Sequence, residues 1–357
     1  MRFNMRLQAQ SKDLNRIIMS GIQPSGVFHL GNILGAVSMW NQLTISEPKS
    51  SKFMFMIADL HSLTSFKPPN VLRDLRIEAL ASILACNIDP VRCNIYFQSQ
   101  APAHSELHWI LSSLTSMGSL SRMVQWKTKS GLDPSSSLSN LASNSPVGKV
   151  GLGLFSYPVL QAADVLINQA TLVPVGIDQA QHLELARHLA RVFNFKYGDV
   201  FAEPETLLAP CKRVLSLRNP DKKMSKSDPD KNSCIYLSDS EDTINRKLKL
   251  AVTDSISGQI TELDESRTGV VNLVTIAAAL LHIEPIDFIR TYRPASHLAL
   301  KTIVAEVVNE YLKPVRTEYD RLLRDKEYLE TLANAGAEEA RNRTNGVIAN
   351  VKNAIGL

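Results

Sequence analysis

Two short segments of this sequence carry side chains that could bind and activate a nucleotide. Residues 223–227 (KMSKS) place two lysines and two serines within five positions, which is enough to surround a triphosphate. Preplaced cations of this kind stabilise the charge that develops on a pyrophosphate leaving group. Residues 29–32 (HLGN) follow a strand-like run and begin a helical pattern. Because the free N–H groups of a helix N-terminus favour phosphate, His29 and Asn32 would add side-chain donors to a phosphate site there.

A third segment presents a phenol, an amide and a carboxylate on one helix face. Helical spacing places Tyr157, Gln161 and Asp164 on one face of a predicted helix. A carboxylate that faces an apolar pocket can accept a hydrogen bond from an indole N–H, the only polar group of a tryptophan side chain. Such a pocket would reject phenylalanine, because the carboxylate would then be buried without a partner. The alternative is a capping carboxylate, or one on the helix surface.

The elements that must position these segments alternate along the first part of the chain. Apolar runs predict strands at residues 16–22, 53–58, 94–97 and 172–176. Helical periodicity predicts helices at residues 30–43, 70–86, 157–167 and 179–193. Strands that alternate with helices predict an α/β fold, in which a Rossmann-like parallel sheet is covered by helices on both faces.

The sequence pattern changes after residue 236, where strand-like runs end. Helical patterns then cover residues 238–252, 268–283, 297–327 and 330–355. We therefore predict a Rossmann-like catalytic domain over 17–205, a KMSKS loop region over 206–235 and an all-helical C-terminal domain over 236–357. Residues 130–150 are rich in Ser, Asn, Gly and Pro, which predicts a mobile surface loop within the catalytic domain.

Composition limits the class of protein. Hydrophobic residues make up 44% and charged residues 21% of the 357 positions, as in soluble globular proteins. The sequence has no apolar run near the roughly 20 residues that a membrane span needs, so we expect no membrane partner. The net charge is only +4, but basic residues gather locally in a way that suits polyphosphate or RNA. They are Lys212, Arg213, Arg218, Lys222, Lys223, Lys226 and Lys231, followed by Arg246, Lys247 and Lys249.

The cysteines, histidines and N-terminus bear on metal binding and compartment. The four cysteines form no CxxC pair and have no zinc-finger spacing, which fits a reducing compartment without a zinc site. His104 and His108 have the i,i+4 spacing of a metal pair, but no HExxH-type motif accompanies them. Residues 1–16 are basic and lack an apolar core, which argues against a secretory signal and leaves a mitochondrial presequence or an ordinary N-terminal segment.

These motifs together resemble a known family. Residues 29–32 resemble the HIGH signature of class I aminoacyl-tRNA synthetases, and residues 223–227 match their KMSKS signature letter for letter. The strings SGIQPSG, YPVLQAAD, VGIDQAQHLE and KMSKSD resemble the bacterial-type tryptophan–tRNA ligases, and the resemblance runs from Ile18 to the C-terminus. It implies that L-tryptophan is activated with ATP and esterified to tRNA(Trp). It also implies a homodimer and a helical domain that holds the anticodon arm.

The resemblance also assigns residues to a site. It implies an ATP site formed by Gln23, Pro24, Ser25, Gly31, Asn32, Gly176, Ile177, Asp178, Val214, Lys223, Met224, Ser225, Lys226 and Ser227. It implies a tryptophan site formed by Asp164, Tyr157, Gln161, His61 and Gln179, with Asp178 and Gln179 near the substrate ammonium. We expect His29, Asn32, Lys223 and Lys226 to act in catalysis, and Mg²⁺ to be carried on the ATP phosphates rather than by a protein metal site.

Three features depart from the common bacterial pattern. Gln161 stands where many bacterial relatives carry methionine, so its amide needs a partner. Ile177 replaces the usual glutamate, which puts in doubt a carboxylate role in ribose binding at that position. The loop over 130–150 is longer than the bacterial one. Gln161, the loop and the basic N-terminus favour the mitochondrial matrix over the alternative, a bacterial cytoplasm.

Other interpretations of these segments stay open. A tyrosine–tRNA ligase shares both signatures, although Ala163 occupies the place where a phenol pocket usually offers a second hydroxyl partner. A small-molecule nucleotidyltransferase would need neither KMSKS nor a helical tail, and intact lysines speak against a non-catalytic RNA-binding or splicing relative. His61 is a pocket residue or an ordinary core histidine. Lys127 and Lys129 could reach the ATP phosphates or the tRNA acceptor end, or lie in a solvated loop.

Overall fold

A computed structural model of the protein describes residues 15–133, 147, 149–208, 214–226 and 228–357. Its centre is a five-stranded sheet in the order β3-β2-β1-β4-β5, and its strand pairs are parallel. The strands are β1 (Ile17–Ile22), β2 (Lys52–Ile57), β3 (Asn94–Phe97), β4 (Leu172–Val175) and β5 (Glu205–Leu208). The predicted α/β class and the four predicted strands are confirmed, whereas β5 is an edge strand that the sequence pattern did not reveal.

The strand order creates a crevice beside β1. The chain winds outward from β1 to β3 and then crosses to the other side of β1 to form β4 and β5. The segments that follow β1 and β4 therefore leave the sheet in opposite directions. Open α/β sheets bind ligands at such a reversal, outside the carboxyl ends of the strands.

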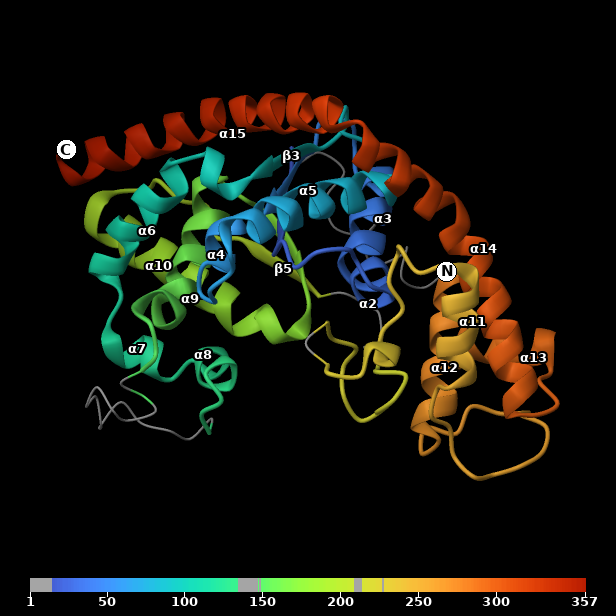
Figure 1. The fold of residues 1–357 in the computed structure, drawn as a ribbon. Coiled ribbons are helices and arrows are strands. Elements are labelled where there is room, and N and C mark those ends of the chain that lie inside the picture. The colour runs from blue at the N-terminus through green and yellow to red at the C-terminus, as the bar shows by residue number, and fades with distance from the viewer. Residues whose placement is uncertain (1–14, 134–146, 148, 209–213, 227) are drawn as a thin grey trace.

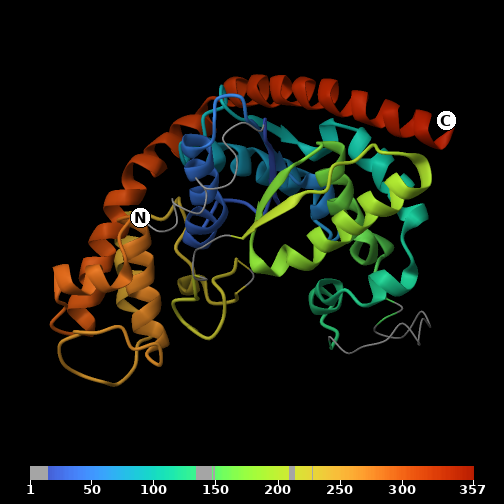
Figure 2. The ribbon, with the colours of Figure 1, turned by 180° about the vertical axis from the view of Figure 1, so that it is seen from behind.

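Helices surround the sheet (Figures 1 and 2). They are α2 (Leu30–Asn32), α3 (Ser38–Ser46), α4 (Asp59–Ser62), α5 (Pro69–Ala85), α6 (Ala103–Leu114), α7 (Met117–Ser121), α8 (Val124–Lys129), α9 (Leu152–Ile167) and α10 (Ala180–Tyr197). A π-helical turn, η1 (Ile33–Val37), interrupts the single helix predicted over 30–43. Short 3-10 turns, η2 (Gln98–Gln100) and η3 (Ile177–Gln179), follow β3 and β4.

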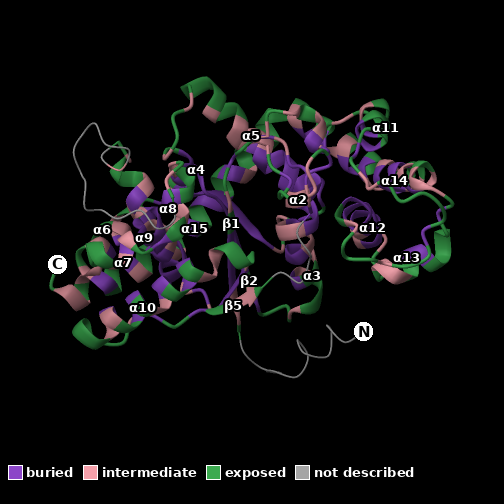
Figure 3. Ribbon diagram, turned by 90° about the horizontal axis from the view of Figure 1, so that it is seen from below, coloured by how far each residue is buried: buried purple, intermediate pink, exposed green. Residues whose placement is uncertain are grey.

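Most residues of β2, β3 and β4 are buried, whereas the edge strand β5 is partly exposed (Figure 3). Successive side chains of a strand point to opposite faces of the sheet. Phe55 of β2 faces the core that contains α3 and α5, where the Trp40 ring stacks on it with centroids 4.3 Å apart. Met56, the next residue, belongs to the cluster on the opposite face, together with Val165 of α9 and Leu183 of α10. Helices therefore cover both faces, as the alternating pattern predicts.

After β5, the described residues form helices joined by loops. Its elements are η4 (Lys231–Ser233), α11 (Glu241–Lys249), α12 (Thr268–Leu280), α13 (Pro285–Tyr292), α14 (His297–Arg324) and α15 (Lys326–Ile355). Ser240, Ser296 and Asp325 each accept a backbone N–H in the first turn of α11, α14 and α15, which fixes where these helices begin. Helices α11, α12 and α13 gather around the first part of α14, at one end of the molecule (Figure 1).

The last helix, α15, turns back along the sheet (Figures 1 and 2). It runs beside β3, and a Cβ atom on Gly336 would lie only 2.0 Å from the carbonyl oxygen of Ile95. Arg341 donates to the carbonyl of Gln100 at 3.1 Å. The C-terminal helix thus packs against the Rossmann-like part of the chain, because Gly336 lets the two backbones approach closely.

Several predicted features fall outside the described residues. They include most of the loop over 130–150, nearly all of residues 1–16, and Lys212, Arg213 and Ser227. Within the described ranges, no single helix is both long and apolar enough to cross a membrane, although α12 and α13 pass that test together as a pair bent by 93°.

Candidate active site

A cavity of about 630 Å³ opens at the carboxyl ends of β1 and β4. The predicted site residues that line it are Gln23, Ser25, Gly31, Asn32, His61, Tyr157, Gln161, Asp164, Gly176, Asp178, Gln179, Lys223 and Ser225. Those that do not line it are Pro24, His29, Ile177, Val214, Met224 and Lys226, and Ser227 is outside the described residues. The fold therefore brings the motifs after β1 and β4, the α9 face and one lysine of KMSKS into a single space.

Asp164 of α9 reaches this cavity with its carboxylate held by three side chains. His61 Nε2 lies 2.8 Å from Oδ2, and Gln98 Nε2 and His104 Nδ1 each lie 2.7 Å from Oδ1. Asp164 is only 1% exposed. Burial raises the pKa of its carboxyl, but the hydrogen bonds from His104 and His61 outweigh burial and lower the pKa to about 2. Asp164 is therefore an anion at neutral pH, although it is buried.

Tyr157, Gln161 and Gln179 meet at His182 of α10. The Nδ1 atom of His182 lies 2.9 Å from Gln161 Oε1 and 3.0 Å from Gln179 Oε1, and its Nε2 atom lies 3.3 Å from the Tyr157 hydroxyl. Amide oxygens only accept hydrogen bonds, so the imidazole proton belongs on Nδ1. Burial lowers the pKa of His182 to about 4, which keeps the ring neutral at pH 7. Gln161, which departs from the bacterial pattern, thus has a partner for its amide oxygen.

Helix α8 closes one side of the cavity beside Tyr157. The Tyr157 hydroxyl donates to Gln125 Oε1 at 2.8 Å, and Gln125 Nε2 donates to the carbonyl of Asp178 at 2.6 Å. Lys129 Nζ lies 4.5 Å from the centroid of the Tyr157 ring, and both Gln125 and Lys129 line the cavity. Lys127 does not line it and is buried beside the Trp126 ring. Of the two lysines, only Lys129 is thus placed to reach a bound substrate.

The turn between β1 and α2 places Gly31 and Asn32 at the cavity wall. Asn32 Oδ1 accepts the backbone N–H of His29 at 3.2 Å. A Cβ atom on Gly31 would lie 2.8 Å from Cε1 of His29, so only glycine fits beside this ring. Burial, together with the nearby Lys226 and Lys223, lowers the pKa of His29 to about 3. His29 is therefore a neutral imidazole beneath the turn rather than a cation in the cavity.

The described part of the KMSKS segment, residues 223–226, lies over that same turn. Lys226 Nζ donates to the carbonyls of Ser25 at 3.2 Å and Gly26 at 2.8 Å. Burial lowers the pKa of Lys226 to about 8, and the charge of Glu78 opposes this shift. The backbone N–H of Met224 donates to the carbonyl of Val214 at 2.9 Å. The hydrogen bond between Met224 and Val214 thus holds the start of the segment, while Lys226 joins the segment to the loop after β1.

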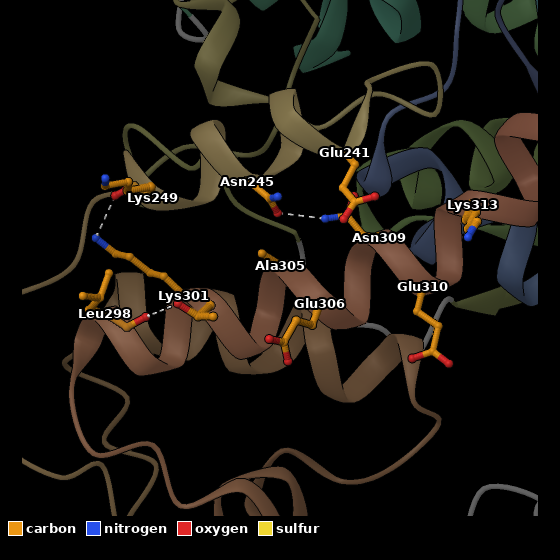
Figure 4. Close-up of a pocket in the computed structure, with 11 residues that line it drawn as sticks. Glu241, Asn245, Lys249, Leu298, Lys301, Ala305, Glu306, Asn309, Glu310 and Lys313 are labelled. Carbon is orange, nitrogen blue, oxygen red and sulfur yellow. Dashed lines mark hydrogen bonds between the residues drawn. The ribbon is translucent and has the colours of Figure 1, made fainter.

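A second cavity, of about 730 Å³, lies between α11 and α14 (Figure 4). Its charged lining residues are Glu241, Lys249, Lys301, Glu306, Glu310 and Lys313. Across it, Asn309 Nδ2 donates to Asn245 Oδ1 at 2.9 Å. The two cavities share no lining residue among those described.

Sequence reasoning missed four side chains of the first cavity's network. They are Gln98, His104, Gln125 and His182. In the sequence, His104 stands out only by its spacing from His108, whereas in the structure its Nδ1 atom contacts Asp164. His182 lies inside the VGIDQAQHLE string, so that string did contain a signal. Gln98 and Gln125 show no local pattern, because each reaches the site from a separate element, η2 and α8. Within the described ranges, no group of three or more His, Cys, Asp or Glu side chains could hold a metal ion.

The sequence matches the family model for class I tRNA synthetases (W and Y) over residues 12–315, so the chain belongs to this family. It is 43% identical to the mitochondrial tryptophan–tRNA ligase of Saccharomyces cerevisiae over all of this chain and 95% of that relative. The tryptophanyl-tRNA synthetase of Mycoplasma pneumoniae superposes with a TM-score of 0.83 at 29% identity, covering 96% of this chain and 98% of that one. The enzyme of Campylobacter jejuni, solved with ADP and tryptophan, gives 0.77 at 31% identity, covering 96% and 100%. Within the family, the chain belongs with the tryptophan–tRNA ligases.

Proposed function

We propose that the cavity at β1 and β4 binds ATP and L-tryptophan side by side and forms tryptophanyl-adenylate, which is then transferred to tRNA(Trp). The observation that carries this proposal is the buried, ionised Asp164 in the same cavity as Lys223 and Asn32. An anionic acceptor suits the indole N–H, and the lysine suits a polyphosphate. The bound ADP and tryptophan of the Campylobacter jejuni enzyme support this pairing of ligands.

The first step joins the amino acid to AMP. The tryptophan carboxylate attacks the α-phosphorus of ATP in line, the bond to the β-phosphate breaks, and pyrophosphate leaves. The protein supplies position and charge rather than a covalent nucleophile. Lys223 and Lys226 stabilise the charge on the leaving group, and Asn32 and the neutral His29 shape the phosphate turn. Mg²⁺ is carried on the ATP phosphates.

The second step consumes the adenylate. The 2′-hydroxyl of the terminal tRNA adenosine attacks the acyl carbon, its proton is released, and AMP leaves. Adenosine binds along the turn after β1 and the loop after β4. These segments contain Gln23, Pro24, Ser25, Gly31, Gly176, Ile177 and Asp178, and Val214 and the KMSKS residues 223–227 complete the ATP site. The exposed Ile177 offers no carboxylate for the ribose, so Asp178 takes that place.

Tryptophan specificity comes from the α9 side of the cavity. Asp164 accepts the indole N–H, and Tyr157, Gln161 and His61 surround the ring. Gln179, which His182 orients, receives the substrate ammonium together with Asp178. Hydrogen bonds from three side chains fix the Asp164 carboxylate, and the indole N–H of tryptophan is its fourth donor. Phenylalanine has no such N–H, so its binding would leave this buried anion one donor short.

The remaining parts of the proposal concern tRNA, assembly and location. Residues 236–357 bind the anticodon arm, and the α11–α14 cavity with its three lysines offers contacts to RNA. The enzyme acts as a homodimer on one tRNA that touches both subunits. The mitochondrial relative of Saccharomyces cerevisiae supports a place in the mitochondrial matrix.

ATP–pyrophosphate exchange with each of the twenty amino acids, supplied singly, tests the proposal. Exchange with tryptophan alone is the expected result. Exchange with tyrosine would keep the fold and the activation step but overturn the role given to Asp164. No exchange from protein that still binds ATP would exclude amino-acid activation and favour a non-catalytic RNA-binding role.

A further inference from the structure

We propose that His104 and Gln98 are positioning residues that set tryptophan specificity, because they hold the Asp164 carboxylate with Oδ2 turned toward the indole N–H. This inference rests on the proposed function. It assigns a role to two side chains that line no part of the cavity and would touch no substrate.

The two carboxylate oxygens of Asp164 differ in their donors. Oδ1 receives Gln98 Nε2 and His104 Nδ1, both at 2.7 Å, whereas the one donor to Oδ2 among the described residues is His61 Nε2 at 2.8 Å. A carboxylate oxygen has two lone pairs, so Oδ1 is filled and Oδ2 keeps one acceptor site. Asp164 and His61 line the cavity, whereas Gln98 and His104 do not. The free lone pair therefore belongs to the oxygen on the cavity side.

A buried chain of hydrogen bonds fixes the proton of His104. Asn168 Nδ2 donates to the Tyr96 hydroxyl at 3.0 Å, and that hydroxyl lies 3.2 Å from His104 Nε2. The ionised Asp164 carboxylate can only accept, so His104 carries a proton on Nδ1 and donates it to Oδ1. Nε2 of this tautomer accepts the proton of the Tyr96 hydroxyl, whose oxygen accepts from Asn168 Nδ2. His104 and Asn168 are 0% exposed and Tyr96 is 1% exposed, so water does not compete for these hydrogen bonds.

Gln98 is oriented by the same anion. Its Nε2 atom faces Oδ1 of Asp164, and its Oε1 atom has no hydrogen-bond partner within the described part of the chain. Flipping the amide would set an oxygen against the carboxylate, which is worse than leaving one acceptor unpaired. Gln98 is itself 0% exposed, so its donor is committed to Asp164.

The C-terminal helix anchors the far end of the chain. Arg343 of α15 donates twice to the carbonyl of Asn168, from Nε at 3.2 Å and from Nη2 at 3.0 Å. Asn168 also donates to the carbonyl of Asp164 at 2.9 Å. Asn168, which donates to Tyr96, is thus held by α15, and no residue of α15 lines the pocket.

The test compares two substrates that differ only in the indole N–H. L-tryptophan and β-(benzothiophen-3-yl)-L-alanine, in which sulfur replaces N–H, are supplied to ATP–pyrophosphate exchange. The ratio of their kcat/KM values measures how strongly the hydrogen bond between the indole N–H and Asp164 favours tryptophan. We expect His104→Leu and Gln98→Met each to reduce this ratio about tenfold or more, with the KM for ATP unchanged. We expect His104→Asn to retain it within about threefold, because its amide nitrogen replaces Nδ1.

Each other outcome overturns the proposal. If His104→Leu lowers kcat/KM for both substrates equally, the residue is only structural. If His104→Asn loses the ratio as fully as His104→Leu, the Nδ1 donor is not what matters. Should His104→Leu fail to fold, Gln98→Met and His104→Asn still give the ratio. His188→Leu, on an exposed position of α10, is the matched control. Wild-type protein that does not activate tryptophan would instead refute the proposed function.

Discussion

Lys226 Nζ donates to the carbonyl oxygen of Gly26 at 2.8 Å, which joins the KMSKS segment to the loop after β1. These residues are 200 positions apart in the sequence. Lys226 does not line the cavity in this arrangement, whereas Lys223 does. Under the proposed function, the charge of Lys226 acts on the pyrophosphate leaving group in the transition state.

Lys226→Ala should slow formation of the adenylate by about 100-fold, because a preplaced cation that stabilises developing charge is lost. The KM for tryptophan should change little, since Lys226 is not near Asp164. Single-turnover measurements of adenylate formation separate the two effects. Weaker tryptophan binding at an unchanged rate would contradict the assignment.

The rate should also depend on pH through Lys226. Burial lowers the pKa of this amine to about 8, so the ammonium is present below pH 8 and is lost above it. The proposed role needs the charged form, so kcat/KM for ATP should fall as pH rises through 8. Lys226→Arg keeps its charge throughout this range and should lack the fall. An identical profile in both proteins would show that another group titrates.

Asp164→Asn should abolish most tryptophan activation. The amide presents N–H groups to the His61, His104 and Gln98 donors and offers only one acceptor oxygen. We expect kcat/KM for tryptophan to fall by at least about 100-fold, with ATP binding intact. Isothermal titration with ATP and exchange assays with tryptophan measure the two properties. Normal tryptophan activation by this variant would remove Asp164 from the specificity role.

Gly31→Ala should damage the phosphate turn. The added Cβ would lie 2.8 Å from Cε1 and 3.0 Å from Nδ1 of His29, so the ring or the turn must shift. A displacement of this kind should lower kcat for exchange by about 10- to 100-fold. Gly153→Ala is the control, because a Cβ there has nothing within 4 Å. Equal activity of the two variants would mean that His29 adjusts freely.

Gly336→Ala should destabilise the protein by about 1–3 kcal/mol or more, since the added Cβ would lie 2.0 Å from the backbone oxygen of Ile95. Gly346→Ala, in the same helix, meets nothing within 4 Å and should be neutral or slightly stabilising. Thermal and urea unfolding of both variants compare the two sites. A stable Gly336→Ala protein would show that α15 can move away from β3.

The local sequence determined the strands and the helix faces, because these depend on residues that are close together in the chain. The four predicted strands follow from apolar runs, and the α9 face that carries Tyr157, Gln161 and Asp164 follows from helical spacing. The motif order placed HLGN after β1. The edge strand β5 has no such signal, because a short strand with one neighbour needs little apolar sequence.

Tertiary structure alone decided what surrounds these side chains. Asp164 is hydrogen-bonded to His61, Gln98 and His104, which are 103, 66 and 60 positions away in the sequence. Lys226 meets Gly26, and α15 meets β3, across still longer separations. Such contacts depend on how strands are ordered in the sheet and how helices pack on it. A one-dimensional pattern of spacing and hydrophobicity reports the face on which a residue lies, but not which distant residue that face will meet.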